Sequence, residues 1–262
     1  MSGGATLVRR GIKAAVLPVG ALRRRRAGDL VVLLYHTVGA GSAEIDVPAA
    51  EFERQLEWLA SSGEVRSLDD AMEDSGGGVV VSIDDGYRDF ADTVLPLLER
   101  HRVPTVLYLA TGLVVEGDGR TAGLLDWSDL RAAVATGLVT VGSHTHDHVD
   151  LSRASEREAD DEMRRSKELI EDRLGVACRH FAYPWAVASP GAERAAGRHF
   201  ETAALSAWRT NRRGRIDPLR LGRTPVLRSD SGALFRAKVG GMLDGEAWAY
   251  RALRRGPWGR RP

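Results

Sequence analysis

The chain has 262 residues, of which 37 are basic and 36 acidic, and its formal net charge is +1. This balance excludes a nucleic-acid binder that works by bulk charge, and no apolar run approaches the ~20 residues of a membrane span. The single cysteine, Cys178, excludes an internal disulfide, and 43% apolar residues is ordinary for a soluble globular chain.

Apolar runs typical of buried strands alternate along the chain with segments of helical periodicity. The expected strands cover residues 30–36, 78–83, 104–110, 138–143, 179–184, 201–207 and 223–227. The expected helices cover residues 48–63, 87–101, 126–137, 155–175, 190–200 and 231–253, with a surface loop at 112–123. This regular alternation predicts an α/β fold with a parallel sheet, either open or closed into a barrel.

Both ends of the chain are rich in arginine. We expect a basic arm over residues 1–28, a catalytic domain over 29–253 and a basic tail over 254–262. Four arginines follow the short apolar stretch of the arm, where a secretory signal would need small residues. The arm is therefore expected to be either a frayed end or a helix on an anionic membrane surface.

Two aspartates, Asp84 and Asp85, stand side by side where the apolar run 79–83 ends. In a parallel β/α fold, functional groups gather at the carboxyl ends of the strands. The segment after residue 143 is placed in the same way and holds His144, His146 and His148. A helical turn would bring the first and last imidazoles together, whereas an extended segment would align all three. Either arrangement can hold a divalent metal, and one aspartate could complete the site.

These motifs resemble those of the polysaccharide deacetylases, the NodB-homology or carbohydrate esterase 4-like family. "SIDDGY" is similar to the family's T-F-D-D-G motif, "SHTHDH" to its H-[ST]-x-x-H motif, and "HFAYPWA" to its Pro-aromatic segment. The resemblance covers roughly residues 30–230. It implies a distorted (β/α) barrel with about seven parallel strands.

The resemblance also implies a role for each matching residue. Asp84 becomes the general base, and Asp85, His144 and His148 become ligands of a divalent metal, zinc first among them. His146 falls on a variable position and is expected not to bind the metal. The segment Tyr183, Pro184 and Trp185 is expected to line the cleft, to bind substrate and to supply an oxyanion N–H from Trp185.

The sequence departs from the family pattern in two places. Ala182 stands where many members carry an arginine that braces the base, so this role is either vacant or filled elsewhere, with Arg179 as one guess. Many members take their general acid from a late histidine, but this chain has none after His199. His36, at the end of the first expected strand, is the substitute that we expect.

The expected function is therefore the metal-dependent removal of an acetyl group from an N-acetylated sugar, polysaccharide or glycoconjugate, by metal-bound water with Asp84 as base. The alternatives are an O-deacetylase of an acetylated polysaccharide and a catalytically impaired member that binds glycan. The partners expected are a carbohydrate substrate, no nucleic acid, and an anionic membrane surface touched by the basic ends. The basic ends favour the cytoplasm or inner membrane surface, while an extracellular location stays open.

Overall fold

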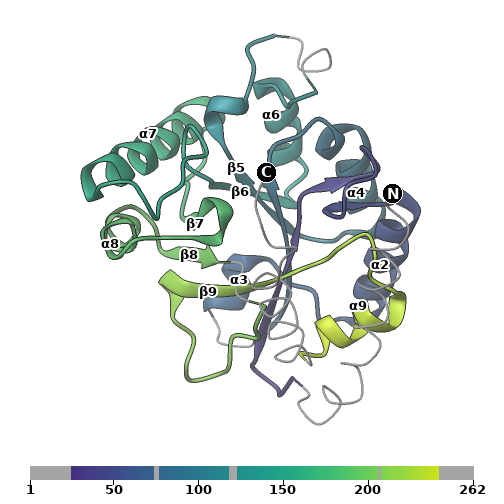
Figure 1. Ribbon diagram of the computed structural model, residues 1–262. Helices are drawn as coiled ribbons and strands as arrows, with labels where there is room; N and C mark the ends of the chain where they lie inside the picture. The colour runs from purple at the N-terminus through teal and green to yellow at the C-terminus, as the bar shows by residue number, and fades with distance from the viewer. Residues whose placement is uncertain (1–24, 74–76, 118–122, 206–207, 242–262) are drawn as a thin grey trace, which may run out of the picture.

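A closed barrel of seven parallel strands forms the centre of the protein (Figure 1). The structure, a computed structural model, describes residues 25–73, 77–117, 123–205 and 208–241. The strands lie in the order β1, β4, β5, β6, β7, β8 and β9, and β9 pairs with β1 to close the ring. Their bounds are Leu30–Tyr35 (β1), Gly78–Asp85 (β4), Thr105–Leu109 (β5), Val139–Ser143 (β6), His180–Ala182 (β7), Thr202–Leu205 (β8) and Leu221–Pro225 (β9). The expected (β/α) barrel is thereby confirmed.

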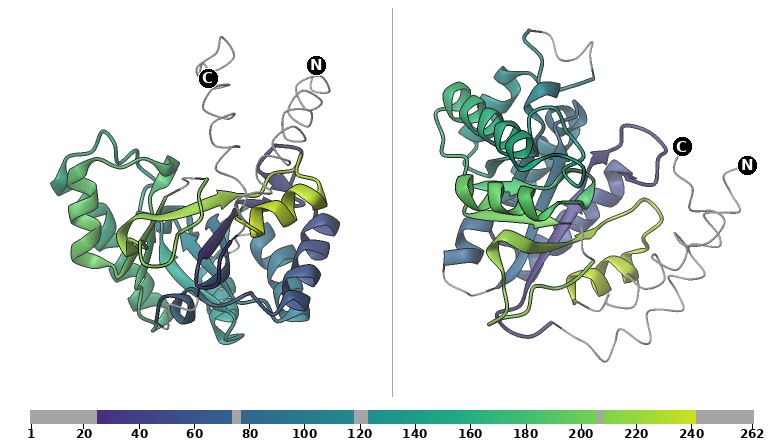
Figure 2. Two further views of the ribbon diagram at one scale, coloured as in Figure 1. Left: turned by 90° about the horizontal axis from the view of Figure 1, so that it is seen from below. Right: turned by 60° about the vertical axis from the view of Figure 1, so that its left-hand side comes forward.

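Helices lie outside the strands on both sides of the barrel (Figure 2). They are α2 (Ala49–Ser62), α3 (Leu68–Glu73), α4 (Leu95–His101), α6 (Trp127–Ala135), α7 (Glu156–Leu174), α8 (Pro190–His199) and α9 (Gly232–Val239). Short 3₁₀ turns occur at Thr111–Leu113 (η2), Pro184–Ala186 (η3) and Pro218–Arg220 (η4), and a small pair of strands at Thr37–Val38 (β2) and Asp46–Val47 (β3). In the part of the chain that the structure describes, no helix is long and apolar enough to cross a membrane.

One expected helix takes a different form, and one short helix is not among those expected. The helix expected over 87–101 consists of a π-helical turn, η1 (Phe90–Val94), followed by α4, in whose first turn Pro96 lies. A proline is tolerated there because its missing N–H would have no intrahelical partner. The six-residue helix α3 was not expected, since six residues carry too little periodicity to be recognised. The ends of the chain, 1–24 and 242–262, lie outside the described residues, and so does part of the helix expected over 231–253.

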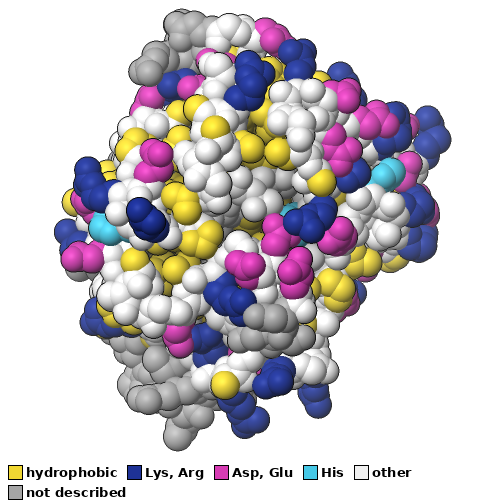
Figure 3. Space-filling model, turned by 180° about the vertical axis from the view of Figure 1, so that it is seen from behind, with side chains coloured by type: hydrophobic (Ala, Val, Ile, Leu, Met, Phe, Trp, Pro, Cys, Tyr) yellow, Lys and Arg dark blue, Asp and Glu magenta, His cyan; other side chains and the backbone are white. Residues whose placement is uncertain are grey.

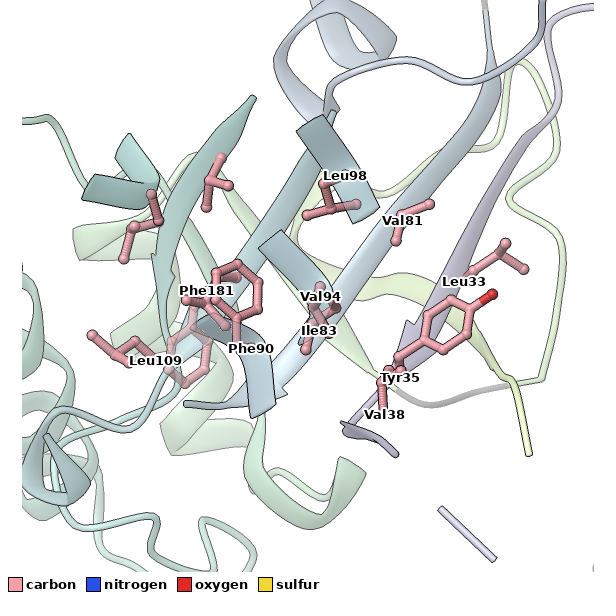
Figure 4. Packing of buried hydrophobic residues seen from close by; sticks show 14 of the residues in the cluster. Leu33, Tyr35, Val38, Val81, Ile83, Phe90, Val94, Leu98, Leu109 and Phe181 are labelled. Atoms are coloured by element: carbon pink, nitrogen blue, oxygen red, sulfur yellow. The ribbon is translucent and has the colours of Figure 1, made fainter. Parts of the chain in front are cut away.

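Two separate apolar clusters hold the barrel and its helices together. The larger one lies between the strands and the helices, where Val94 and Leu98 pack toward Val81 and Ile83 of β4 (Figure 4). The smaller one contains the alternate residues of the strands, such as Val32, Val80 and Val106. Because side chains alternate along a strand, this second cluster fills the inside of the barrel.

Helix α3 closes the amino-terminal end of the barrel. Leu68 and Ala71 belong to the inner cluster. Asp69 accepts a hydrogen bond from Nε2 of His180, the first residue of β7, at 3.0 Å, and forms an ion pair with Arg179 at 2.8 Å. His180 is in turn hydrogen bonded through Nδ1 to Thr202 at 2.9 Å. The end of the barrel that is opposite to Asp85 is thus sealed.

We expect the substitution Asp69→Asn to lower the free energy of unfolding by about 1 kcal/mol at pH 7, a modest amount because the carboxylate is partly exposed. The hydrogen bond from His180 is the largest cause that lowers the pKa of Asp69 below 3.8. The stabilisation is therefore present above pH 3.8 and declines as the pH falls through the lowered pKa. Urea unfolding of both proteins between pH 7 and pH 3 measures this difference. A difference that does not shrink at the acid end would contradict it.

Candidate metal centre at the barrel rim

Asp84 and Asp85 end strand β4 at the carboxyl rim of the barrel. Asp84 continues the inward phase of Val80 and Ser82, so strand alternation alone would send Asp85 to the opposite side. Asp85 instead has a φ of 80°, which breaks the extended conformation at this residue. Both carboxylates consequently lie near the same imidazole, since Nε2 of His144 is 3.7 Å from Asp84 and 3.6 Å from Asp85.

Asp85, His144 and His148 form a cluster with the composition of a metal site. One potential ligand atom from each residue lies within 4.8 Å of the other two. Nε2 of His148 is 3.3 Å from Oδ1 of Asp85, and the two imidazole rings are 4.9 Å apart. Two nitrogens and one carboxylate oxygen suit zinc and other divalent transition metals, and three protein ligands leave positions open for water and substrate.

The imidazole of His144 is held in the form that a metal requires. Its Nδ1 lies 2.7 Å from the carbonyl oxygen of Ala182, which can only accept a hydrogen bond, so Nδ1 carries the proton. Nε2 then presents its lone pair toward the aspartates. The pKa of His144 is lowered below its usual value. Burial is the largest cause, and it outweighs Asp84 and Asp85, whose negative charges raise the pKa. The neutral imidazole is therefore favoured, as in many metal-binding histidines.

The buried Oδ1 atom of Asp85 lies near two imidazoles but has no well-formed hydrogen bond among the described residues. Burial raises the pKa of this carboxyl, but the neighbouring imidazoles, His148 first, outweigh it and lower the pKa to about 2. A buried, ionised oxygen without a hydrogen bond is costly, and a cation would satisfy it. The residues present thus fit a divalent metal.

The backbone around the cluster is strained at several residues. Positive φ values occur at Asp85 (80°), Thr145 (67°), His148 (52°), Trp185 (56°) and Ala186 (58°). Such conformations cost of order 1–3 kcal/mol each in residues other than glycine and persist where the surrounding structure imposes them. Their concentration at one rim marks it as the functional end of the barrel.

Arg223 braces Asp84 from inside the barrel. Its guanidinium donates two hydrogen bonds to the Asp84 carboxylate, at 2.6 and 2.8 Å, and lies 5.1 Å from the ring of Tyr108. Both members of the pair are almost completely buried. Burial alone would raise the pKa of Asp84, but Arg223 and then His144 lower it below its usual value. Asp84 is thus ionised at neutral pH.

The guess that Arg179 braces the base is wrong, because its guanidinium pairs with Asp69 at the other end of β7. The bracing role is also not vacant, because Arg223 fills it. Ala182 contributes only its carbonyl oxygen, which bonds His144. Sequence reasoning missed Arg223, which lies on β9 at the end of an arginine-dense segment. The signal available was an arginine in phase with apolar residues of a strand, which implies a buried charge in need of a partner.

The other predicted site residues lie around the same rim. His36 follows β1, and its imidazole is close enough to help lower the pKa of both aspartates. Trp185 is 63% exposed, and its ring lies 5.0 Å from that of His148. Tyr183 is instead fully buried against Phe181, so its side chain supports the turn and does not face the rim. Pro184 is buried as well.

His146 lies outside the ligand cluster, as expected. Its Nδ1 is hydrogen bonded to the hydroxyl of Thr111 at 2.8 Å, and the ring is buried. Extended alignment of all three histidines, one of the two arrangements considered, is therefore not what the chain adopts.

We expect Arg223→Met to lower the free energy of unfolding by about 3–5 kcal/mol, because Asp84 is left as a buried charge without a partner. The double variant Arg223→Met with Asp84→Asn lacks both charges, so its free energy of unfolding should fall by less than that of Arg223→Met alone. Arg179→Met, whose side chain is 39% exposed, is the matched control and should cost less than about 1 kcal/mol. Urea unfolding with a chelator present compares the four proteins. A double variant as unstable as Arg223→Met would contradict the pairing.

Comparisons with known proteins agree with this geometry. The family model for polysaccharide deacetylase matches residues 72–199, which include the aspartate pair, His144, His148 and Trp185. YxkH of Bacillus subtilis (strain 168), whose name describes it as a polysaccharide deacetylase, is 23% identical over 171 residues, covering 62% of this chain and 59% of its own. A poly-β-1,6-N-acetyl-D-glucosamine N-deacetylase of Staphylococcus aureus (strain MRSA252) is 24% identical over 181 residues, covering 62% of each chain.

The chain thus spans about 60% of the length of these curated relatives. Among solved structures, a polysaccharide deacetylase from Bacillus cereus has the same fold, with a TM-score of 0.72 and 20% identity over 80% of this chain and 69% of that one. The aspartate pair and the histidine motif therefore lie within the segment that matches the family model. Residues 72–199 thus match the polysaccharide deacetylase family, and the barrel has the fold of a solved member of that family.

Proposed function

We propose that the protein is a metal-dependent hydrolase that removes the acetyl group from an N-acetylated sugar of a polysaccharide or glycoconjugate. The observation that carries this proposal is the juxtaposition of Asp85, His144 and His148 with an ionised, separately braced Asp84. The similarity to an N-deacetylase of poly-β-1,6-N-acetyl-D-glucosamine supports an N-acetylglucosamine substrate. The intact set of site residues supports turnover over glycan binding without catalysis.

The two aspartates have different proposed roles, Asp85 as a metal ligand and Asp84 as the general base. Asp85 has a free, ionised oxygen directed at the histidines, which suits a ligand, whereas both oxygens of Asp84 accept hydrogen bonds from Arg223. When bound, a zinc-type ion would supply Lewis-acid polarisation of the acetyl carbonyl and lower the pKa of water. Asp84 is ionised beside this position and can take a proton as general base.

Trp185 is proposed to meet the substrate in two ways. Its exposed indole offers a flat apolar surface on which a sugar ring can stack. In the same turn, the N–H groups of Ala186 and Val187 donate back to Tyr183 and Pro184, which fixes the backbone of the turn. We propose the N–H of Trp185 as the donor that stabilises the oxyanion of the tetrahedral intermediate.

A binding and turnover assay tests the proposal. Zinc, cobalt, nickel and iron are each added to metal-free protein, and acetate release is measured on poly-β-1,6- and β-1,4-linked N-acetylglucosamine oligomers and on an O-acetylated xylan. We expect release from an N-acetylated oligomer that a chelator abolishes and zinc restores. Asp85→Ala, His144→Ala and His148→Ala should lose the metal, whereas His146→Ala, the matched control on the same loop, should keep it.

Three outcomes would count against the proposal. Loss of metal in His146→Ala alone would show that the ligands are wrong. Release from the xylan only would identify an O-deacetylase. Tight glycan binding without any release would identify a binding protein.

We propose His36 as the general acid that protonates the departing amine. It directly follows β1, the strand next to β4, and its imidazole is close enough to help lower the pKa of both aspartates. His36→Ala should therefore keep zinc bound and lower kcat at least about 100-fold, the lower end of what general acid catalysis contributes. Acetate release, with bound zinc measured in the same samples, checks this. Full turnover in His36→Ala would exclude the assignment.

We further propose that the basic ends hold the enzyme at an anionic inner membrane surface. Among the described residues, Arg25, Arg26 and Arg66 line a cavity of about 420 Å³ at the amino-terminal end of the barrel, together with Glu64, which pairs with Arg25. On the face seen in Figure 3, basic and acidic side chains are otherwise interspersed. Cell fractionation that places the protein outside the cell would refute this location.

A further inference from the structure

The loop that joins His144 to His148 has to be held in place by something other than a metal ligand. It contains two left-handed residues, Thr145 and His148, with φ values of 67° and 52°. A loop with such a backbone does not keep its conformation by itself, because each residue would gain free energy by returning to the ordinary region. The orientation of His148 toward Asp85 depends on this conformation.

Glu162, on helix α7, holds the loop from one side. Its Oε2 atom accepts a hydrogen bond from the N–H of His146 at 3.0 Å and a second from the N–H of Asp147 at 2.8 Å. These are the two residues between Thr145 and His148. Two neighbouring N–H groups that converge on one carboxylate oxygen require a curved backbone, which is the conformation found here. Hydrogen bonds to a charged acceptor are also stronger than those between neutral groups.

The turn η2 holds His146, the first of these two residues, from the other side. The N–H of Gly112 donates to the carbonyl oxygen of His146 at 2.8 Å, and the hydroxyl of Thr111 is bonded to the His146 imidazole at 2.8 Å. A Cβ atom added at Gly112 would lie only 2.7 Å from that carbonyl oxygen, so the approach requires glycine. The N–H groups of the loop are thus fixed by α7 and its carbonyl by η2.

We propose that Glu162 is a positioning residue of the metal centre, which presets His148 for metal binding through the backbone of His146 and Asp147. This inference rests on the proposed metal site. It adds Glu162, 16 positions from His146 in sequence, which bonds the N–H groups of His146 and Asp147 and not the side chains of the proposed ligands. Glu162 acts through the position of its acceptor oxygen and not through its charge. A neutral side chain that places an acceptor oxygen at the same position should therefore preserve metal binding.

A purely electrostatic role predicts the opposite pattern. A negative charge near the centre would favour a cation at any side-chain length, so Asp would replace Glu and Gln would not. Glu162→Gln keeps an acceptor oxygen at the same reach and loses the charge. Glu162→Asp keeps the charge but is one methylene shorter, so that it cannot reach both N–H groups.

The experiment measures the zinc dissociation constant by competition with a chromophoric chelator. We expect Glu162→Gln to stay within about threefold of the wild type, and Glu162→Asp and Glu162→Ala to bind zinc at least 10-fold more weakly, as is typical when a partner of a metal ligand is removed. The matched control is Asp161→Asn, at the adjacent acidic residue of α7, whose exposed side chain forms ion pairs with Arg157 and Arg164. It should leave the constant unchanged.

The outcomes separate the possible failures. Circular dichroism with chelator present shows whether each variant folds, and the Gln and Asp variants decide the question if Glu162→Ala does not. Weak binding by the Gln variant with normal binding by the Asp variant would overturn the geometric role, and so would equal binding by all variants. A folded wild type that binds no zinc would instead overturn the metal centre, and this inference with it.

Discussion

The buried ion pair between Arg223 and Asp84 is the interaction on which the candidate centre depends. A carboxylate at the carboxyl end of β4 would be expensive to bury next to Asp85 without a cation of its own. Arg223 supplies that cation from inside the barrel and occupies both oxygens of Asp84. Asp85 is then left with the free oxygen that faces His144 and His148. The different roles proposed for two adjacent, chemically identical residues follow from this one contact.

The pair can form only because the barrel closes. Arg223 is 139 residues away from Asp84 in sequence, and it reaches the lumen since β9 pairs with β1, which pairs with β4. The ring of Tyr108 lies against the guanidinium, and Gly142 leaves room for that ring, because a Cβ atom there would lie 2.8 Å from it. The inside of the barrel therefore carries a buried ion pair toward the rim where catalysis is proposed.

The rim combines rigid strand ends with strained connections. The φ values of Asp85, Thr145, His148 and Trp185 are all positive, and each turns a side chain or a backbone group away from the direction that a regular strand would give it. Glu162, Thr111 and Gly112 stabilise one of these connections, and the carbonyl oxygen of Ala182 orients His144. Ala182 thus takes part in the centre through its backbone, although its side chain cannot replace the arginine of other family members.

Alternation of strands and helices, and the place of Asp84, Asp85, His144 and His148 at strand ends, were predictable from the sequence, because periodicity and strand termini are local properties. The exact length of the helix after β4 and the existence of α3 were not, since a π-helical turn and a six-residue helix leave weak patterns. The expected roles of His36 and Trp185 came from a family resemblance, and they remain predictions about residues that the fold brings to one rim.

The sequence by itself thus determined the alternation of strands and helices and, through its resemblance to a family, indicated the barrel and the candidate metal ligands. Only the tertiary structure decided what braces Asp84, which way His144 is protonated and how the loop before His148 is held. Each of these depends on a contact between residues far apart in the chain or on a left-handed backbone at a residue other than glycine. Neither leaves a periodic pattern in the sequence, because the partner is chosen by barrel closure and helix packing, not by local spacing.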